Sequence, residues 1–196
     1  MIGWIRALAN RLSSIPLVYE WIQRLAGQDL VYRKILGFWT ADQREGVLDV
    51  GSSGGALTEK LAPRATCVDI DLEPLVRARR KRPRLRLVVA SAASLPFRAK
   101  SFDRTVCVEV SHHLEGPVLA AAVEEFARVT RSSLLFVDAV RAPGWIPRLL
   151  WSLDRGAAPR AASELRAHLS LHFEFEKETE FRVLHEYVLW SARPKR

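Results

Sequence analysis

The chain has 196 residues, of which 48% are hydrophobic, so it is long and apolar enough to bury a substantial core as one globular domain. Its net charge of +8 and pI near 10.1 are compatible with an anionic partner such as nucleic acid or a lipid surface, but the excess of arginine over lysine fits a thermophile or a GC-rich genome at least as well. No apolar run reaches the roughly eighteen residues of a membrane span, and no signal-peptide core is seen, so we predict a cytoplasmic protein.

The first forty residues predict helices. Apolar residues recur at helical spacing between positions 4 and 12 and again between 18 and 25, and a third helix is expected over 30–39. Such amphipathic helices bury one face against a neighbouring element, so we expect them to pack on a sheet formed by the rest of the chain.

Residues 47–55 read Val-Leu-Asp-Val-Gly-Ser-Ser-Gly-Gly, which predicts a buried strand that enters a tight turn of small residues. Glycine tolerates positive φ and leaves room for a ligand against the main chain. A second apolar run ends in Asp69 about twenty residues later, where a strand-borne acid would accept both ribose hydroxyls of an adenosine. The two features together predict a nucleoside-binding bend.

Strands and helices alternate along the middle of the chain. Strands are expected over 47–50, 66–69, 85–89, 101–109 and 132–140, with helices over 56–62, 72–82 and 117–129. This rhythm predicts a parallel sheet with helices on both faces and a ligand at the carboxyl ends of the strands. Cys67 and Cys107 fall inside these strands, so we interpret them as reduced core residues.

The helix over 72–82 ends in a cluster of cations, which we interpret mainly as a solvated helix end because no aromatic residues are interleaved to stack on bases. The cluster consists of Arg77, Arg79, Arg80, Lys81 and Arg82.

The last third of the chain departs from the alternation. Residues 141–156 are apolar and rich in tryptophan, a helix is expected over 161–171, and strands over 173–183 and 185–192 predict a hairpin. The complete pattern is that of an α/β protein. We predict a Rossmann-like, seven-stranded, mostly parallel sheet with a C-terminal antiparallel hairpin and helices on both faces.

Between residues 47 and 138 the motifs resemble those of the class I S-adenosylmethionine-dependent methyltransferases, in the small-molecule branch of the methyltransferase type 11 or ubiquinone-menaquinone methyltransferase-like kind. The resemblance rests on the small-residue loop, the Val-Asp strand end, the loop of residues 91–97 ending in Leu-Pro-Phe, and the Phe-Asp pair at 102–103. It implies one domain over 1–196. Its parts would be a helical lid over 1–40, a cofactor-binding core over 46–140, a substrate-side insertion and helix over 141–170, and the hairpin over 173–193.

The resemblance also implies that S-adenosyl-L-methionine is the cofactor and S-adenosyl-L-homocysteine the product. The loop residues would face the methionine half, the acid would hold the ribose, and the next residues would flank or read the adenine or close the site. In chain order these are Asp49, Gly51, Ser52, Ser53, Gly55, Asp69, Ile70, Leu72, Ser91, Ala92, Glu109 and Val110. Two positions depart from the family: Ser53 replaces a glycine, so the turn must accept a side chain, and Ser91 replaces an aspartate, which weakens a hydrogen bond to adenine.

Polar residues after the fourth predicted strand are candidates for the chemistry. Methyl transfer mainly requires alignment of the nucleophile and exclusion of water, and a base is needed only when the acceptor carries a proton. His113, and next His112, are the preferred bases because imidazole titrates near neutrality, with Glu109 beside them. The alternative is that a histidine caps the strand and neither is catalytic. No cysteine or carboxylate stands at metal-ligand spacing, so we predict no metal.

The acceptor is less defined by the sequence. The segment 109–112 is not the Asn/Asp-Pro-Pro-Tyr/Phe loop of nucleobase amino methyltransferases, and Cys107 lies within a strand, unlike a nucleophilic cysteine. We therefore expect a small-molecule or lipid-like acceptor. The tryptophans near 145–151 and Trp4 could contact an anionic membrane or only pack in the core. An RNA methyltransferase that uses the basic surface and a non-catalytic partner-binding protein stay open, and a nicotinamide-dependent oxidoreductase is less favoured.

Overall fold

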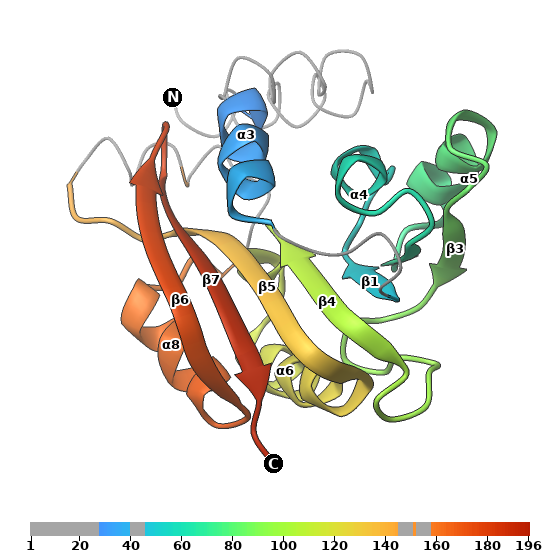
Figure 1. Ribbon diagram of the computed structural model, residues 1–196. Coiled ribbons are helices and arrows are strands. Elements are labelled where there is room, and N and C mark those ends of the chain that lie inside the picture. Colours follow the sequence, from blue (N-terminus) through green and yellow to red (C-terminus); the bar gives the residue numbers. More distant parts are fainter. Residues whose placement is uncertain (1–27, 40–45, 145–150, 152–157) are drawn as a thin grey trace.

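A seven-stranded sheet organises the described part of the chain (Figure 1). The computed structural model describes residues 28–39, 46–144, 151 and 158–196. The strand order is β3-β2-β1-β4-β5-β7-β6. The strands are β1 (Val47–Val50), β2 (Thr66–Asp69), β3 (Arg86–Val89), β4 (Phe102–Val108), β5 (Thr130–Val140), β6 (Phe173–Arg182) and β7 (Glu186–Pro194). The helices are α3 (Gln28–Phe38), α4 (Ala56–Leu61), α5 (Leu72–Lys81), α6 (Gly116–Val129), α8 (Ala162–Ser170) and the 3-10 helix η1 (Ser111–His113).

The first five strands pair in parallel, and β7 runs antiparallel to both β5 and β6. The predicted fold class is therefore confirmed, including the terminal hairpin. Strand order reverses at β1, whose Asp49 lies opposite Cys67 of β2 on one side and Val106 of β4 on the other. The carboxyl ends of the parallel strands thus meet at one edge, which is where open α/β sheets bind ligands.

Helices cover both faces of the sheet, as predicted, and each layer has its own core. On one face α6 and α8 bury Leu119, Phe126 and Leu165 against β4, β5 and β7. On the other face α3 and α4 bury Ile35 and Leu57 against β1, β5 and β7. Alternate residues of each central strand enter opposite cores, which explains why these strands are apolar on both faces.

The observed elements begin and end within about two residues of their predicted positions, which is the usual scatter of helix and strand ends. Cys67 and Cys107 are free thiols buried in β2 and β4, as predicted. The two helices predicted before residue 27 and most of the tryptophan-rich segment lie outside the described residues. Among the described helices, none combines the length and the apolar character that crossing a bilayer demands.

Truncation of Phe126 tests the contribution of the α6 layer. Its ring is fully buried between α6 and the sheet, so Phe126→Ala should lower the free energy of unfolding by about 3–5 kcal/mol. Val118 lies on the same helix with 40% of its surface exposed, and Val118→Ala should change stability by no more than about 0.5 kcal/mol. Urea unfolding followed by circular dichroism measures both, and equal losses would contradict the assignment of the core.

Candidate functional site

The loop after β1 folds into a tight bend against β2. The backbone N–H groups of Gly51 and Ser52 both donate to the carbonyl of Val68, at 2.8 and 3.1 Å. Gly51 has a φ of 76°, and a Cβ at this position would lie 2.2 Å from Cγ2 of Val110. Glycine is therefore required twice, by the backbone conformation and by the close approach of the loop that follows β4.

The bend is held to the end of β2 by a carboxylate. Ser53 donates its backbone N–H to Oδ2 of Asp69 at 2.6 Å, and Asp71 donates its own to Oδ1 at 3.0 Å. Ser53 has a φ of 47°, so the turn does place a side chain in the left-handed region that favours glycine. The structure thus brings the small-residue bend and the strand-end acid into direct contact, as the sequence predicts.

Asp49 is buried at the carboxyl end of β1. Thr58 on α4 donates a hydrogen bond from its hydroxyl to Oδ2 of Asp49. Burial raises the pKa of Asp49 to about 7, the hydrogen bond from Thr58 opposes this rise, and the negative charge of Asp69 adds to it. A carboxyl group that changes charge near neutrality thus lies under the bend, where a cationic ligand would stabilise its ionised form.

Arg82 supports the same bend from the end of α5. Its guanidinium donates to the carbonyl of Gly54 at 2.9 Å and forms an ion pair with Glu59 at 3.3 Å. The prediction that Arg82 belongs to a solvated cluster is therefore wrong, because its side chain turns back across the sheet end to the glycine loop. Arg79, Arg80 and Lys81 are exposed, as predicted, and Arg77 pairs with Glu73.

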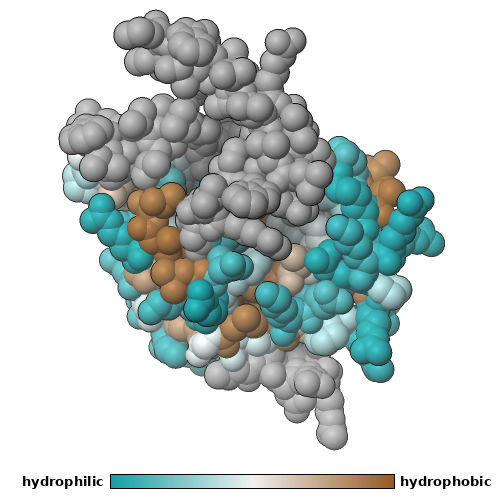
Figure 2. All heavy atoms as spheres, turned by 90° about the horizontal axis from the view of Figure 1, so that it is seen from above, coloured by the Kyte–Doolittle hydropathy of each residue, from teal (hydrophilic) through white to brown (hydrophobic). Residues whose placement is uncertain are grey.

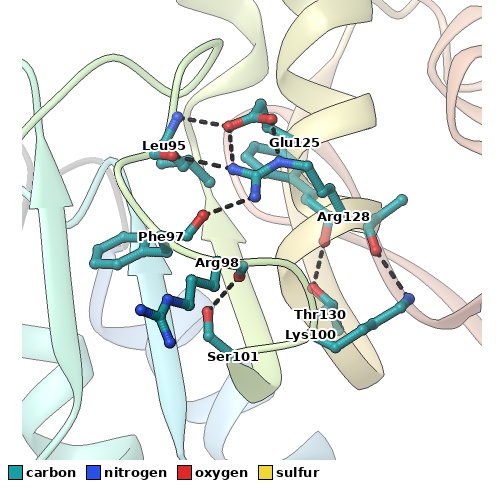
Figure 3. A network of polar contacts seen from close by, with 10 residues as sticks. Leu95, Phe97, Arg98, Lys100, Ser101, Glu125, Arg128 and Thr130 are labelled. Carbon is teal, nitrogen blue, oxygen red and sulfur yellow. Dashed lines mark hydrogen bonds and ion pairs between the residues drawn. The ribbon is translucent and has the colours of Figure 1, made fainter.

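The loop after β3 is fixed by an ion pair on α6 (Figure 3). Arg128 binds Glu125 through two hydrogen bonds of 2.6 and 2.7 Å and donates to the carbonyls of Leu95 and Phe97. Glu125 in turn accepts the backbone N–H of Leu95 at 2.6 Å. The Leu-Pro-Phe segment is thereby tied to the helix, which fixes the end of the turn that begins at Ser91.

Residues around this turn leave an apolar rim beside the strand-end acid. Ile70 is 70% exposed and Leu72 is 61% exposed, although both are large hydrophobic residues. The hydroxyl of Ser91 accepts the backbone N–H of Ala93 at 3.2 Å, so this serine shapes its own turn. The predicted adenine-side residues therefore surround the carboxyl ends of β2 and β3, while their contact with an adenine stays a prediction.

The segment after β4 adopts a constrained conformation. Glu109 has a φ of 57°, which is uncommon for a residue with a side chain and costs of order 1–3 kcal/mol. Its backbone N–H donates to the carbonyl of Val137 at 2.8 Å, and Tyr187 on β7 donates its hydroxyl to Oε1 at 2.9 Å. Two neighbouring strands therefore hold Glu109 in place at the carboxyl edge of the sheet.

The two predicted histidines lie in different environments. His112 is buried, and its Nδ1 lies 2.5 Å from Oδ1 of Asp138 on β5, whereas His113 is exposed. Oδ2 of Asp138 accepts both the backbone N–H and the hydroxyl of Ser111, at 2.6 and 2.5 Å. Burial alone would raise the pKa of Asp138, but the charge of His112 and the hydrogen bonds from His112 and Ser111 together lower it.

Several residues of this edge were not identified in the sequence. Five residues contact the predicted site residues or their immediate neighbours, yet they lie on helices, strands or loops whose spacing carries no motif. They are Thr58, Arg82, Asp138, Arg160 and Tyr187. Asp138 gave the one available signal, since it is a carboxylate inside an otherwise apolar strand. Among the described residues, no group of three or more potential ligands is placed to hold a metal ion.

Comparison with known families agrees with this arrangement. Residues 48–137 match the family model described as a methyltransferase domain. This stretch contains the bend, Asp69, the loop of residues 91–97, both histidines and α6. The matched stretch, just under half of the chain, is similar to the methyltransferase domain of S-adenosylmethionine-dependent enzymes. A search of characterised proteins by sequence finds no match.

Solved structures with the same fold include methyltransferases. An S-adenosylmethionine-dependent methyltransferase of Methanosarcina mazei superposes with a TM-score of 0.69 at 18% identity, covering 82% of this chain and 96% of its own. The N-methyltransferase NodS of Bradyrhizobium japonicum WM9, in complex with S-adenosyl-L-homocysteine, gives 0.63 at 20% identity, covering 78% and 79%. The [4+2]-cyclase SpnF gives 0.70 at 18% identity, covering 85% and 81%. At these identities the likeness establishes the fold alone.

The raised pKa of Asp49 predicts a specific dependence of stability on pH. Between the ordinary value of 3.8 and about 7, the folded state retains a proton that the unfolded state has lost. The free energy of unfolding should therefore fall as pH rises from about 4 to about 7, by up to about 4 kcal/mol, and then level off. Asp49→Asn should lack this fall, and the exposed variant Asp71→Asn should retain it. Urea titrations at several pH values measure it, and parallel curves for wild type and Asp49→Asn would contradict it.

The left-handed backbone at Ser53 predicts that glycine is tolerated there. Ser53→Gly removes about 1–2 kcal/mol of backbone strain and adds about 0.5–1 kcal/mol of unfolded-state entropy, so stability should rise by up to about 1 kcal/mol. Ser52 has no positive φ, and its hydroxyl donates to the carbonyl of Val68, so Ser52→Gly should lower stability. Thermal unfolding compares the two variants, and a lower melting temperature for Ser53→Gly would count against the strained turn.

Proposed function

We propose that this protein transfers a methyl group from S-adenosyl-L-methionine to a small-molecule or lipid-like acceptor. The observation that supports this most strongly is the contact between the glycine-rich bend and the carboxylate of Asp69 at the switch point of the sheet. A bend of this kind brings main-chain donors to a ligand, and a strand-end acid beside it accepts ribose hydroxyls. The family match and the described fold agree with this use of the edge.

The residues at the edge fit the adenosyl group. Asp69 uses each carboxylate oxygen for one backbone donor, which leaves lone pairs for two hydroxyl groups. Ile70 and Leu72 expose apolar surface next to it for a planar base. Within the described part of the chain, a Cβ at Gly54 would meet nothing within 4 Å, so these residues leave the outer wall of the bend open. When bound, S-adenosyl-L-methionine supplies an electrophilic methyl group on a sulfonium.

The role of this chain is then to bind and orient the cofactor and the acceptor and to shield them from water. The ionised form of Asp49 would attract the cationic methionine half, and the bend at Gly51 to Gly55 would position it. Glu109 and the histidines of η1 stand at the end of β4, next to the bend, because Val110 packs against Gly51. The closeness of this turn to the bend supports our proposal that His112, His113 and Glu109 are the candidates to take a proton from the acceptor.

A second candidate activity is methylation of RNA. In the view from above, hydrophilic residues gather on the side of the molecule that carries α5 and β3 (Figure 2). Arg79, Arg80 and Lys81 are exposed there. Binding of RNA through such a surface would weaken steeply with salt, whereas binding of a neutral small acceptor would change little. We also propose that the protein lies in the cytoplasm and that its net charge of +8 brings it into peripheral contact with anionic membranes.

Replacement of Asp69 tests the cofactor. Asp69→Asn loses the charge and one acceptor, so the Kd for S-adenosyl-L-homocysteine should rise at least about tenfold, since a hydrogen bond to a charged group contributes about 1.5–3 kcal/mol. Asp71→Asn is the matched control, because it alters an exposed acid two residues away and keeps the backbone donor to Asp69. Calorimetric titration measures both. If the wild-type chain binds neither S-adenosylmethionine nor S-adenosylhomocysteine at millimolar concentration, the proposed function is wrong.

A further inference from the structure

We propose that the side of the molecule formed by α5 and β3 is a docking surface for an anionic lipid bilayer. This inference rests on the proposed function and deepens it, because it names the surface through which the protein reaches a lipid-like acceptor. The surface combines cations that have no carboxylate partner with exposed aliphatic side chains, and these are two separate observations.

Acidic residues are missing from the segment that forms most of this surface. The sequence has no aspartate or glutamate between Glu73 and Asp103, although the chain has 22 acidic residues in all. Cations are frequent in the same stretch. Those that are exposed between the last turn of α5 and the start of β3 are Arg79, Arg80, Lys81, Arg84 and Arg86. The surface therefore has a positive potential that no carboxylate of the same segment offsets.

The five cations are also unpaired in three dimensions. None of them forms an ion pair with another described residue, whereas the exposed Arg166 on α8 pairs with Glu178. The helix dipole favours cations in the last turn of α5, but it does not account for Arg84 and Arg86, which lie beyond the helix. Cations gathered in this way repel one another, and an anionic partner removes that cost.

Two valines expose aliphatic surface on the same side of the molecule. Val76 on α5 is 52% exposed, and Val89 at the end of β3 is 51% exposed. Val76 lies three and four positions before Arg79 and Arg80, so these side chains are neighbours on the helix surface. In the view from above, a hydrophobic patch on this side is bordered by hydrophilic residues (Figure 2). Cations around a small apolar patch match the boundary between lipid headgroups and acyl chains.

The composition of the surface favours a bilayer over RNA. Residues 70–96 form α5, β3 and the loops around them, and they include no aromatic residue that would stack on bases. Exposed valines add nothing to contacts with phosphate groups, whereas they enter the headgroup region of a bilayer. Each lysine or arginine close to an anionic leaflet strengthens binding about fivefold, so the cations together support reversible docking without a lipid anchor.

Docking through this surface brings the cofactor edge close to the bilayer. Val89 pairs with Asp69 in the register of β3 and β2, and α5 begins at Leu72, three residues after that acid. The surface thus adjoins the apolar rim that we propose for the adenine. A lipid-like acceptor then enters the carboxyl edge of the sheet from the neighbouring headgroup region.

Flotation with lipid vesicles tests the cations. Wild type should bind vesicles of phosphatidylcholine with about a quarter phosphatidylglycerol, should not bind vesicles of phosphatidylcholine alone, and should be released by added salt. The triple variant Arg79→Glu, Arg80→Glu, Lys81→Glu should lose about 100-fold or more of the affinity for anionic vesicles. Wild-type binding that is no stronger to anionic than to neutral vesicles would overturn the docking surface.

A control variant reverses three exposed cations on other sides of the molecule. Lys34→Glu on α3, Arg98→Glu in the loop before β4 and Arg182→Glu on β6 give the same net charge as the triple variant on α5. This control should retain binding to anionic vesicles within about fivefold, because its charges lie away from the docked side. Equal losses in the two variants would mean that net charge alone attracts the protein, and the docking surface would be wrong.

A fluorescent label at position 76 tests contact with lipid directly. Cys67 and Cys107 are buried, and burial raises the pKa of Cys67 to about 12, so a maleimide dye reacts at an introduced surface cysteine. Emission of a polarity-sensitive dye on Val76→Cys should shift to the blue when anionic vesicles are added. The same dye on Val118→Cys, on α6, should not shift. A shift at both positions, or at neither, would overturn the assignment of the surface.

Binding of S-adenosyl-L-homocysteine separates this inference from the proposed function. The triple variant on α5 keeps Arg82, which holds Gly54, so its Kd for this ligand should equal that of wild type. Wild type that binds the ligand but no anionic vesicle overturns the docking surface alone, and vesicle binding without ligand binding overturns the proposed function alone. Wild type that binds single-stranded RNA but no vesicle would assign the cations to RNA and would also overturn the docking surface.

Discussion

Each loop at the switch point of the sheet is tied to a carboxylate on the neighbouring strand. The loop after β1 donates the N–H of Ser53 to Asp69 on β2, and the loop after β4 donates the N–H of Ser111 to Asp138 on β5. In both cases an ordered main-chain donor meets a negative charge at the end of a parallel strand, and such bonds are stronger than neutral ones. These two contacts fix the loops that follow β1 and β4 at the carboxyl edge.

The same two hydrogen bonds lie beside strained backbone, which they help to stabilise. Ser53 and Glu109 both have positive φ although neither is glycine. Ser53 is itself the donor to Asp69, and Glu109 lies two residues before the donor Ser111. Backbone strain of this kind persists only where the surroundings determine the conformation, and it gathers at ligand sites. The bend and the turn are thus kept side by side, with Val110 packed against Gly51 between them.

The fold could be predicted from the sequence because hydrophobic periodicity follows the strands and helices closely. The apolar runs at 47–50 and 66–69 and the final hairpin gave the strand pattern, and the Val-Asp and small-residue motifs placed Asp69 beside the bend. The residues that support the site could not be found this way. Arg82 comes from a run of similar cations, and Asp138 lies 26 positions after its partner His112, so only the folded chain brings each to its contact.

The two adjacent histidines show that sequence-based prediction also fails to distinguish neighbouring residues. In the sequence His112 and His113 are adjacent and chemically equal, and His113 was the preferred base. The 3-10 turn of η1 sends one ring into the protein, toward Asp138, and leaves the other exposed. A spacing rule cannot separate adjacent residues on a turn, because their directions depend on backbone angles that the neighbouring strands impose.

The buried thiol of Cys67 lies beneath the glycine loop, so its reactivity reports the opening of that loop. Its sulfur lies 3.4 Å from the position that a Cβ on Gly55 would occupy, so the glycine loop covers it directly. Burial raises the pKa of Cys67 to about 12, and the negative charge of Asp49 adds to this, so the thiolate that alkylating reagents require is scarce while the loop is closed. Reaction at this cysteine therefore reports how often the loop lifts from the sheet, a motion that any ligand resting on the bend would slow.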